Sequence, residues 1–257
     1  MKAPQKIHIH LVSDSTGVLV VQQGRHPVLE QTTTGSSFVP NDIQLDESER
    51  FLLITGPNMA GKSTMMRQVA LWILMAQMGS FVPADSMKMS IVDQLFSRIG
   101  AMDNLYHGQS TFMVEMLETA KILHNATDKS FVILDEVGRG TATYDGVSLA
   151  YSISEFIHDR LRCRTLFATH YHELTQLAAR YSAIQNYNMK VEEVDGNVVF
   201  TYQFKVGCAD KSYGIHVAQM AGIPASVTNR ATEIMVSLEQ GEGSGQQRSI
   251  GDQLSLF

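Results

Sequence analysis

Residues 56–63 have the types and spacing of a phosphate-binding loop. They read GPNMAGKS and fit the pattern G-x-x-x-x-G-K-[ST]. In such a loop backbone N–H groups surround a phosphate, the lysine reaches the β- and γ-phosphates, and the serine hydroxyl binds Mg²⁺. The pattern arises by chance in on the order of one per cent of chains this long. We therefore predict a nucleotide site made by Gly56, Pro57, Asn58, Met59, Ala60, Gly61, Lys62, Ser63 and Thr64.

The sequence on both sides of this loop supports the same interpretation. Residues 51–55 form an apolar stretch typical of a buried strand, and residues 64–78 contain neither proline nor glycine, which favours a helix. The order strand, glycine loop, helix places a helix N-terminus beside a phosphate. The context therefore favours nucleotide binding over a chance match.

Acidic residues and a histidine follow two further apolar stretches. Residues 129–134 and 165–169 predict strands that lead into Asp135-Glu136 and His170. Ligand sites of α/β proteins form at the carboxyl ends of strands. We expect Asp135 to hold Mg²⁺ with Ser63, and Glu136 to polarise an attacking water. We expect His170 to hydrogen-bond that water or a γ-phosphate; the alternatives are two exposed acids and a structural histidine.

Strands and helices alternate along most of the chain. Helices are predicted at 111–125 and 148–161, strand-like pieces at 7–12 and 17–21, and a later antiparallel strand at 198–204, while residues 38–45 lead towards the phosphate-loop strand. This alternation predicts an α/β fold with a mostly parallel sheet flanked by helices.

The last part of the chain has a different pattern of predicted elements. Helices are predicted at 212–221 and 225–240, separated by Gly222-Ile223-Pro224, in a helix-turn-helix outline. No basic recognition face is present, so we interpret the pair as a packing or dimerisation element. Residues 241–251 have the composition of a flexible linker. The predicted organisation is a nucleotide-binding domain at 1–210, a helical appendage at 211–240, and a linker with a terminal peptide at 241–257.

Composition narrows the class of protein. The net charge of −6 over 257 residues argues against a domain that grips DNA by its phosphates. No apolar run is as long as a membrane span, and no secretory signal is evident. Two cysteines are too few for a disulfide framework, so we expect a reduced, cytoplasmic setting.

Several motifs in order resemble the ATPase domain of the MutS family of DNA mismatch-repair proteins. The resemblance covers about residues 17–240. The carrying segments are 55–66 (TGPNMAGKSTMM), 110–118 (STFMVEMLE), 135–145 (DEVGRGTATYD) and 168–174 (ATHYHEL), with shorter matches at 24–30 (GRHPVLE), 38–42 (FVPND) and 211–214 (KSYG).

The resemblance implies a P-loop ATPase of the ABC type that binds ATP and Mg²⁺ at a homodimer interface. It assigns Glu136 as the catalytic carboxylate, Asp135 as the Mg²⁺-associated one and His170 as the γ-phosphate sensor. It further implies that Asn58 positions the lytic water, and that Ser110 and Thr111 reach the partner's γ-phosphate. Adenine would stack at Phe38 and Val39, with Tyr202 as a further base contact; core packing is the alternative for Phe38 and Val39.

Some features depart from the family pattern. Ala60 stands where many members have glycine and Ala142 where many have serine, and both changes keep a short side chain. The family's Phe-x-Glu mismatch wedge has no match in this chain. We therefore expect this chain to be a fragment of a repair protein. Upstream domains of that protein would hold the mismatched DNA, and a MutL-type protein would be a partner.

The terminal peptide resembles the motif by which bacterial repair proteins bind the sliding clamp. It consists of Gln253, Leu254, Ser255, Leu256 and Phe257 after the predicted linker. Apolar anchors on a flexible linker suit a pocket on a partner. A frayed terminus is the alternative.

Three other functions remain open from the sequence. The chain could be a non-hydrolysing, nucleotide-gated interaction module, although such a module would not need Glu136. It could belong to a MutS branch that acts in recombination. A transport or chromosome-maintenance ATPase is disfavoured, because residues 110–113 read STFM and no L-S-G-G-Q stretch occurs.

Overall fold

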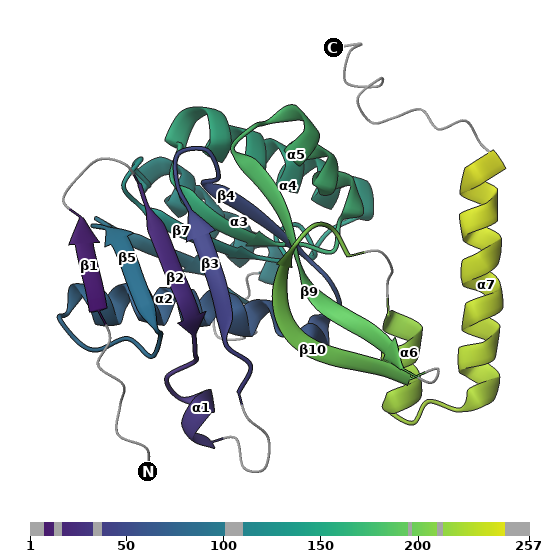
Figure 1. The fold of residues 1–257 in the computed structure, drawn as a ribbon. Helices are drawn as coiled ribbons and strands as arrows, with labels where there is room; N and C mark the ends of the chain where they lie inside the picture. Colours follow the sequence, from purple (N-terminus) through teal and green to yellow (C-terminus); the bar gives the residue numbers. More distant parts are fainter. Residues whose placement is uncertain are drawn as a thin grey trace. The chain divides into compact units, whose positions relative to one another are not determined.

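The computed structural model describes residues 8–12, 17–32, 38–100, 110–194, 197–209 and 213–244. These residues form mixed α/β structure, which confirms the predicted class (Figure 1). The chain divides into two compact units. The first contains residues 1–192 and 199–210, and the second contains residues 193–198 and 211–257.

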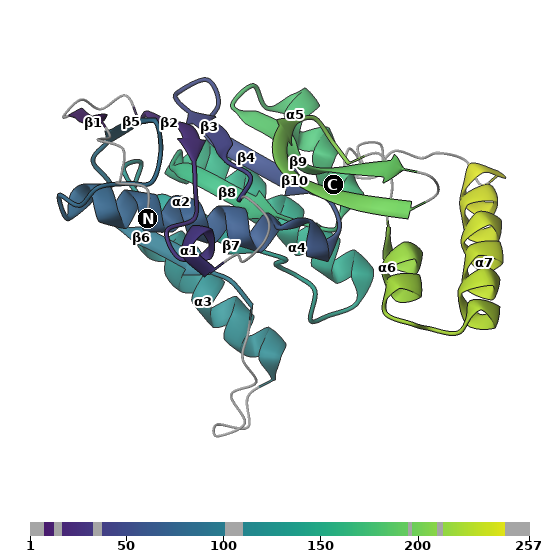
Figure 2. The same cartoon turned by 60° about the horizontal axis from the view of Figure 1, so that its bottom comes forward.

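Six of the described strands form one sheet, in the order β10-β9-β4-β8-β7-β6. The neighbouring pairs β9–β4, β4–β8, β8–β7 and β7–β6 are parallel. Strands β9 and β10 are long neighbours joined through residues 195–196, a connection that only antiparallel strands can make (Figure 2). The strand bounds are β4 Phe51–Thr55, β6 Leu95–Arg98, β7 Phe131–Asp135, β8 Arg164–Ala168, β9 Ile184–Val194 and β10 Asn197–Val206.

A second sheet, of four described strands, was not predicted and is present in addition to the mostly parallel one. Its order is β1-β5-β2-β3, and β2 pairs in antiparallel fashion with both β3 and β5. Strand β5 reads SMKMS, which alternates as a half-buried strand does but has none of the β-branched or aromatic residues typical of strands. The bounds are β1 His8–Val12, β2 Leu19–Gly24, β3 Asn41–Leu45 and β5 Ser86–Ser90.

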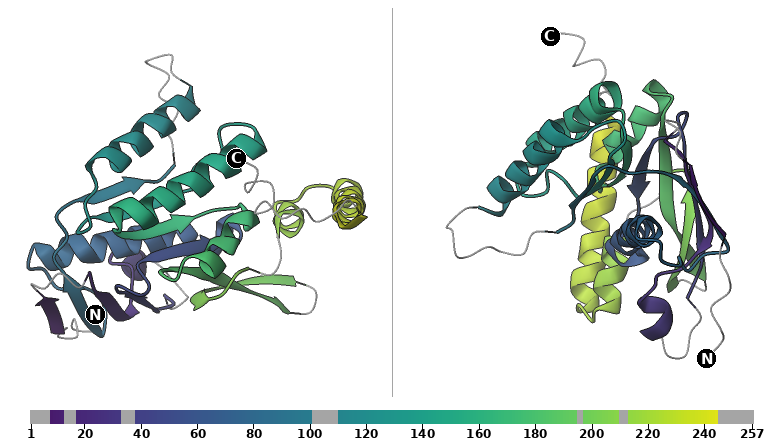
Figure 3. Two further views of the ribbon diagram at one scale, coloured as in Figure 1. Left: turned by 90° about the horizontal axis from the view of Figure 1, so that it is seen from above. Right: turned by 90° about the vertical axis from the view of Figure 1, so that its left-hand side faces the viewer.

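Helix α2 (Lys62–Gln77) lies between the two sheets. Alternation along β4 explains the layers: Leu52 and Ile54 share a buried cluster with α2 and the four-stranded sheet, whereas Phe51 and Leu53 share one with the helices of the opposite face. In the right-hand view of Figure 3, α2 is seen end-on beside the purple strands. The helices of the opposite face are α3 (Thr111–Asn125), α4 (Thr143–Phe156) and the short α5 (Leu177–Arg180).

Two predicted boundaries differ from the structure. Helix α4 begins at Thr143, five residues before the predicted start at 148, and it includes Gly146 in its first turn. In the second unit, α6 spans Gly214–Met220 and α7 spans Ala225–Ser244. Helix α7 thus continues four residues into the predicted linker, since glycine weakens a helix without forbidding it. The remainder of that linker and the terminal peptide at 253–257 lie outside the described residues.

Candidate functional site

The loop from Gly56 to Ser63 connects β4 to α2, as the sequence predicts. A single 3₁₀ turn at Asn58–Ala60 is followed by Gly61, whose φ of +99° is in the left-handed region that favours glycine. This turn directs the chain into α2, so the free N–H groups of the helix start face the loop. Within the loop, Ala60 is fully buried. Met59 and Thr64 line a neighbouring cavity.

Lys62 is held inside the loop at only 1% exposure. Its Nζ donates to the backbone oxygen of Gly56, and Asn58 Oδ1 accepts a longer bond of 3.4 Å. Burial lowers the pKa of Lys62, and the carboxylates of Glu136 and Asp135 act in the opposite direction. A buried ammonium close to two carboxylates is a strong electrostatic centre at this edge of the sheet.

The acidic pair lies beside the loop because β4, β8 and β7 are adjacent parallel strands. Ile54 pairs with Ala168, and Ala168 pairs with Asp135, so the three carboxyl ends meet at one edge. Burial raises the pKa of Asp135, whereas a hydrogen bond from Ser63 lowers it. Within the described part of the chain, Asp135 Oδ1 is buried without a hydrogen-bond partner.

Glu136 has a strained backbone, and each oxygen of its carboxylate has one side-chain partner. Its φ is +57°, an unusual value for a residue with a side chain, and its N–H donates to the oxygen of Ala168 at 2.9 Å. One carboxylate oxygen contacts His170 Nε2 and the other contacts Arg139. The hydrogen bond with His170 is the largest cause that lowers the pKa of Glu136 to about 2, and Arg139 adds to it.

A cavity of about 310 Å³ opens onto this acidic edge. Asn58 from the loop, Glu136 and Arg139 after β7, and His170 after β8 all line it. The structure therefore brings together the three residues that the sequence analysis assigned to catalysis. Arg139 was not singled out, although it lies inside the DEVGRG segment; its ion pair with Glu136 is a tertiary feature with no signal of its own.

A second cavity, of about 390 Å³, also adjoins the glycine loop, and Asn58 lines both cavities. Phe38, Val39 and Tyr202 line it, which brings the three predicted base-contact residues together from segments far apart in sequence. Gly61 and Thr64 of the loop also line this cavity, so it continues directly from the phosphate-loop residues. Further lining residues that the sequence analysis missed are Leu29, Asn41, Met65, Gln68 and Met189.

Asn41 holds Tyr202 in place. The Nδ2 of Asn41 donates to the backbone oxygen of Tyr202 at 2.9 Å, and its Oδ1 accepts the N–H of Phe204 at 2.7 Å. Tyr202 has a φ of +55°, so its backbone is strained. The buried amide thus fixes the backbone from the carbonyl of Tyr202 to the N–H of Phe204.

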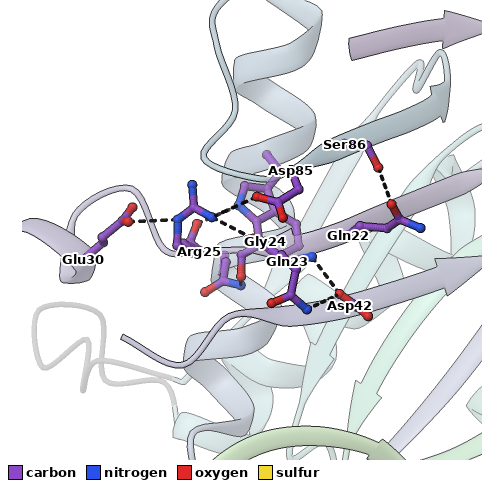
Figure 4. Close-up of polar contacts among 10 residues, drawn as sticks. Gln22, Gln23, Gly24, Arg25, Glu30, Asp42, Asp85 and Ser86 are labelled. Atoms are coloured by element: carbon purple, nitrogen blue, oxygen red, sulfur yellow. Dashed lines mark hydrogen bonds and ion pairs between the residues drawn. The ribbon is translucent and has the colours of Figure 1, made fainter. Parts of the chain in front are cut away.

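Arg25 makes polar contacts close in sequence to Leu29, a lining residue of the same cavity (Figure 4). Its Nε pairs with Glu30 at 2.8 Å, and NH1 lies 3.6 Å from Asp85 and donates to Gln23. Glu30 belongs to the short helix α1 (Leu29–Thr32), whose first residue lines the cavity. Arg25 thereby ties this helix to the end of β2.

Ser110 and Thr111 do not join either cavity. Ser110 precedes α3 and caps it, because its Oγ accepts the N–H of Met113 at 3.1 Å. Both residues are exposed, and neither lines the cavities described above. Their predicted contact with a partner's phosphate stays a prediction.

Comparison with known proteins identifies relatives for most of the chain. A family model described as MutS domain V matches residues 52–239. Proteins named DNA mismatch repair protein MutS are similar: that of Rickettsia felis is 55% identical over 242 residues, which are 92% of this chain and 27% of the relative. That of Rickettsia canadensis is 58% identical over 222 residues, 86% of this chain and 25% of the relative. This chain spans about a quarter of the length of these relatives.

Proposed function

This chain belongs to the MutS family of DNA mismatch-repair proteins, and on that premise we propose that it binds ATP with Mg²⁺ and hydrolyses it. The observation that carries the proposal is the meeting of three groups at one sheet edge. These groups are the glycine loop with Lys62, the pair Asp135-Glu136, and His170. The fold proposed for this unit is that of a P-loop ATPase of the ABC type.

The residues present fit a divalent cation. Asp135 has a buried oxygen without a partner among the described residues, and Ser63 contributes a hydroxyl that hydrogen-bonds to the same carboxylate. Hydroxyl and carboxylate oxygens are ligands that Mg²⁺ prefers. Ser63 and Asp135 would hold the ion, which when bound supplies positive charge to the transferring phosphate.

We assign hydrolysis to the 310 Å³ cavity. Glu136 accepts a hydrogen bond from the attacking water, because its carboxylate stays ionised at any pH above its lowered pKa of about 2. His170 and Arg139 hold the two oxygens of that carboxylate and so fix its orientation. Asn58 faces the same space from the loop, where its amide would orient the water.

We assign the nucleoside to the 390 Å³ cavity. A base there would stack on aromatic and apolar side chains of Phe38, Val39 and Tyr202. The phosphates would extend from this cavity along the loop towards Lys62, whose charge complements them. The backbone N–H groups at the start of α2 add to this attraction.

The wider role is proposed from the family. ATP would act as a switch in a dimer, with Ser110 and Thr111 reaching the partner's nucleotide and the helices α6 and α7 adding a dimerisation surface. Mismatched DNA would be held by parts of the protein other than this chain. The peptide 253–257 would bind the sliding clamp, and a MutL-type protein would respond to the ATP-bound state.

Replacement of Glu136 by Gln tests the proposal. The variant keeps size and hydrogen bonding but removes the carboxylate, so we expect turnover to fall by roughly 10²–10⁴-fold, the usual contribution of a general base. ATP affinity should stay within about twofold, because the nucleoside cavity and Lys62 are unchanged. The matched control is Glu47→Gln, an exposed carboxylate outside both cavities. Equal turnover in wild type and Glu136→Gln contradicts the assignment.

A further inference from the structure

Glu115 is a carboxylate in an apolar position of α3. The buried residues of this helix are Glu115, Thr119 and Ile122, which share one face by their spacing of four and three. Glu115 is only 5% exposed. A charged group in such a place loses its hydration and therefore requires specific partners.

Those partners belong to two other segments. One carboxylate oxygen accepts the backbone N–H of Gly138 at 2.5 Å, and the other lies 3.6 Å from the guanidinium of Arg98. Arg98 is the last residue of β6 and is itself 4% exposed. The ion pair therefore orients the carboxylate towards Gly138, and a charge-assisted hydrogen bond is stronger than a neutral one.

Gly138 is held on three sides in the loop that follows Glu136. Its N–H is bound by Glu115, and its oxygen accepts the hydroxyl of Tyr171 at 2.9 Å. Its φ is +92°, and a Cβ at this position would come within 2.6 Å of the oxygen of Gly146 in α4. This loop is consequently fixed by contacts from α3, from α4 and from the residue next to His170.

We propose that Glu115 is a positioning residue that fastens the loop carrying Glu136 to α3. Glu136 lies two residues before Gly138, and Arg139, which pairs with Glu136, lies one residue after it. A displacement of Gly138 therefore moves both ends of that ion pair. The catalytic consequence rests on the proposed function, whereas the fastening of the loop does not.

The same residue connects two parts of the proposed mechanism. Helix α3 begins immediately after Ser110, and Glu115 lies one helical turn later on its buried side. A force on the start of α3, such as contact with a partner's nucleotide, would pass through Glu115 to the loop that carries Glu136. Nucleotide bound at one site would in this way alter the position of the Glu136 carboxylate at the other site.

The test measures ATP affinity and turnover separately in the full 257-residue chain. Glu115→Ala removes both contacts, and we expect kcat per bound nucleotide to fall about 100-fold, as for a catalytic group misplaced by about 1 Å. Affinity for ATP should remain within about twofold because Glu115 lines neither cavity. Glu115→Gln can still accept from Gly138, so it should restore most of the rate, to within about tenfold of wild type.

Two further variants separate positioning from general stability. Glu118→Gln removes the exposed partner of the same arginine, 3.1 Å from Arg98 Nε, and should change kcat by less than about twofold. Tyr171→Phe removes the other hydrogen bond to Gly138 and should lower kcat while leaving affinity unchanged. Because Tyr171 itself lines the 310 Å³ cavity, amide exchange at Gly138 in Glu115→Gln carries the test if Glu115→Ala does not fold.

Amide hydrogen exchange at Gly138 provides a readout that needs no ATP turnover. Exchange should be about tenfold faster in Glu115→Ala than in wild type, with Glu115→Gln between them. If the wild type has no ATPase activity but the variants show this exchange pattern, the proposed function is rejected and the positioning role of Glu115 is retained. Unchanged exchange at Gly138, or an equal loss of affinity and kcat in the Glu115 variants, would overturn the inference.

Discussion

The two cavities beside the glycine loop are built in opposite ways. The 310 Å³ cavity is lined by polar and charged groups that come from the ends of adjacent parallel strands, and its central carboxylate is held by a cation and a histidine. The 390 Å³ cavity is lined mostly by apolar and aromatic side chains from five segments, with Asn41, Asn58, Thr64 and Gln68 as its polar residues. Charge is thus concentrated where a reaction would occur, and apolar area where a base would be held. The comparison predicts that substitutions in the first cavity change rate or pH dependence and those in the second change affinity.

The largest stability effect should be a pH dependence confined to the acidic cavity. The pKa of Glu136 is lowered from 4.5 to about 2 in the folded protein. The contribution of this carboxylate to the free energy of unfolding is therefore complete above pH 4.5 and disappears as the pH falls towards 2. Its upper limit is on the order of 3 kcal/mol. Denaturant unfolding of wild type and Glu136→Gln between pH 2 and 7 measures it.

The difference in unfolding free energy between these two proteins should be constant above pH 4.5 and should shrink below it. Tyr202→Phe offers a control from the apolar cavity, whose difference from wild type should not change over this range. A constant difference between wild type and Glu136→Gln down to pH 2 would show that the ion pair and hydrogen bond at Glu136 add nothing.

The next effect concerns the apolar cavity. Tyr202→Ala removes the ring but leaves the loop, and we expect ATP affinity to weaken by about 1–3 kcal/mol, the range for loss of a base stack. The rate of hydrolysis of bound ATP should remain within about twofold, because the acidic cavity is untouched. Equilibrium titration and single-turnover hydrolysis measure the two quantities. Tyr202→Phe keeps the ring and should bind as wild type does; a rate loss in Tyr202→Ala without an affinity loss would break the comparison.

The smallest effect concerns the start of α4, which borders the loop that carries Glu136. Ala142 is the N-cap of this helix, has extended backbone angles and supplies no side-chain cap, whereas Ser110 caps α3. Ala142→Ser should add a hydrogen bond to the first turn and stabilise the fold by about 1 kcal/mol. Urea unfolding measures this change, and turnover should be unaffected. A lower unfolding midpoint would mean that the serine hydroxyl does not reach the helix N–H groups.

The sequence predicted the parts of the site that are contiguous. The strand, loop and helix around residues 51–78 are specified by neighbours, and Asp135, Glu136 and His170 each follow an apolar run, so adjacency in a parallel sheet places them together. Strand β9 was not predicted, although Tyr187, Met189 and Val191 alternate with polar residues as in a half-buried strand, and its parallel partner β4 lies far along the chain. The roles of Asn41, Arg139 and Glu115 depend on tertiary contacts that no local pattern encodes.

The central claim is that binding and hydrolysis occupy separate cavities, and Glu136→Gln tests it most directly. ATP affinity and single-turnover hydrolysis should be measured on the same preparation, with wild type and Tyr202→Ala beside it. The account predicts near-wild-type affinity with hydrolysis slower by roughly 10²–10⁴-fold in Glu136→Gln, and the reverse pattern in Tyr202→Ala. Wild-type hydrolysis in Glu136→Gln would contradict it.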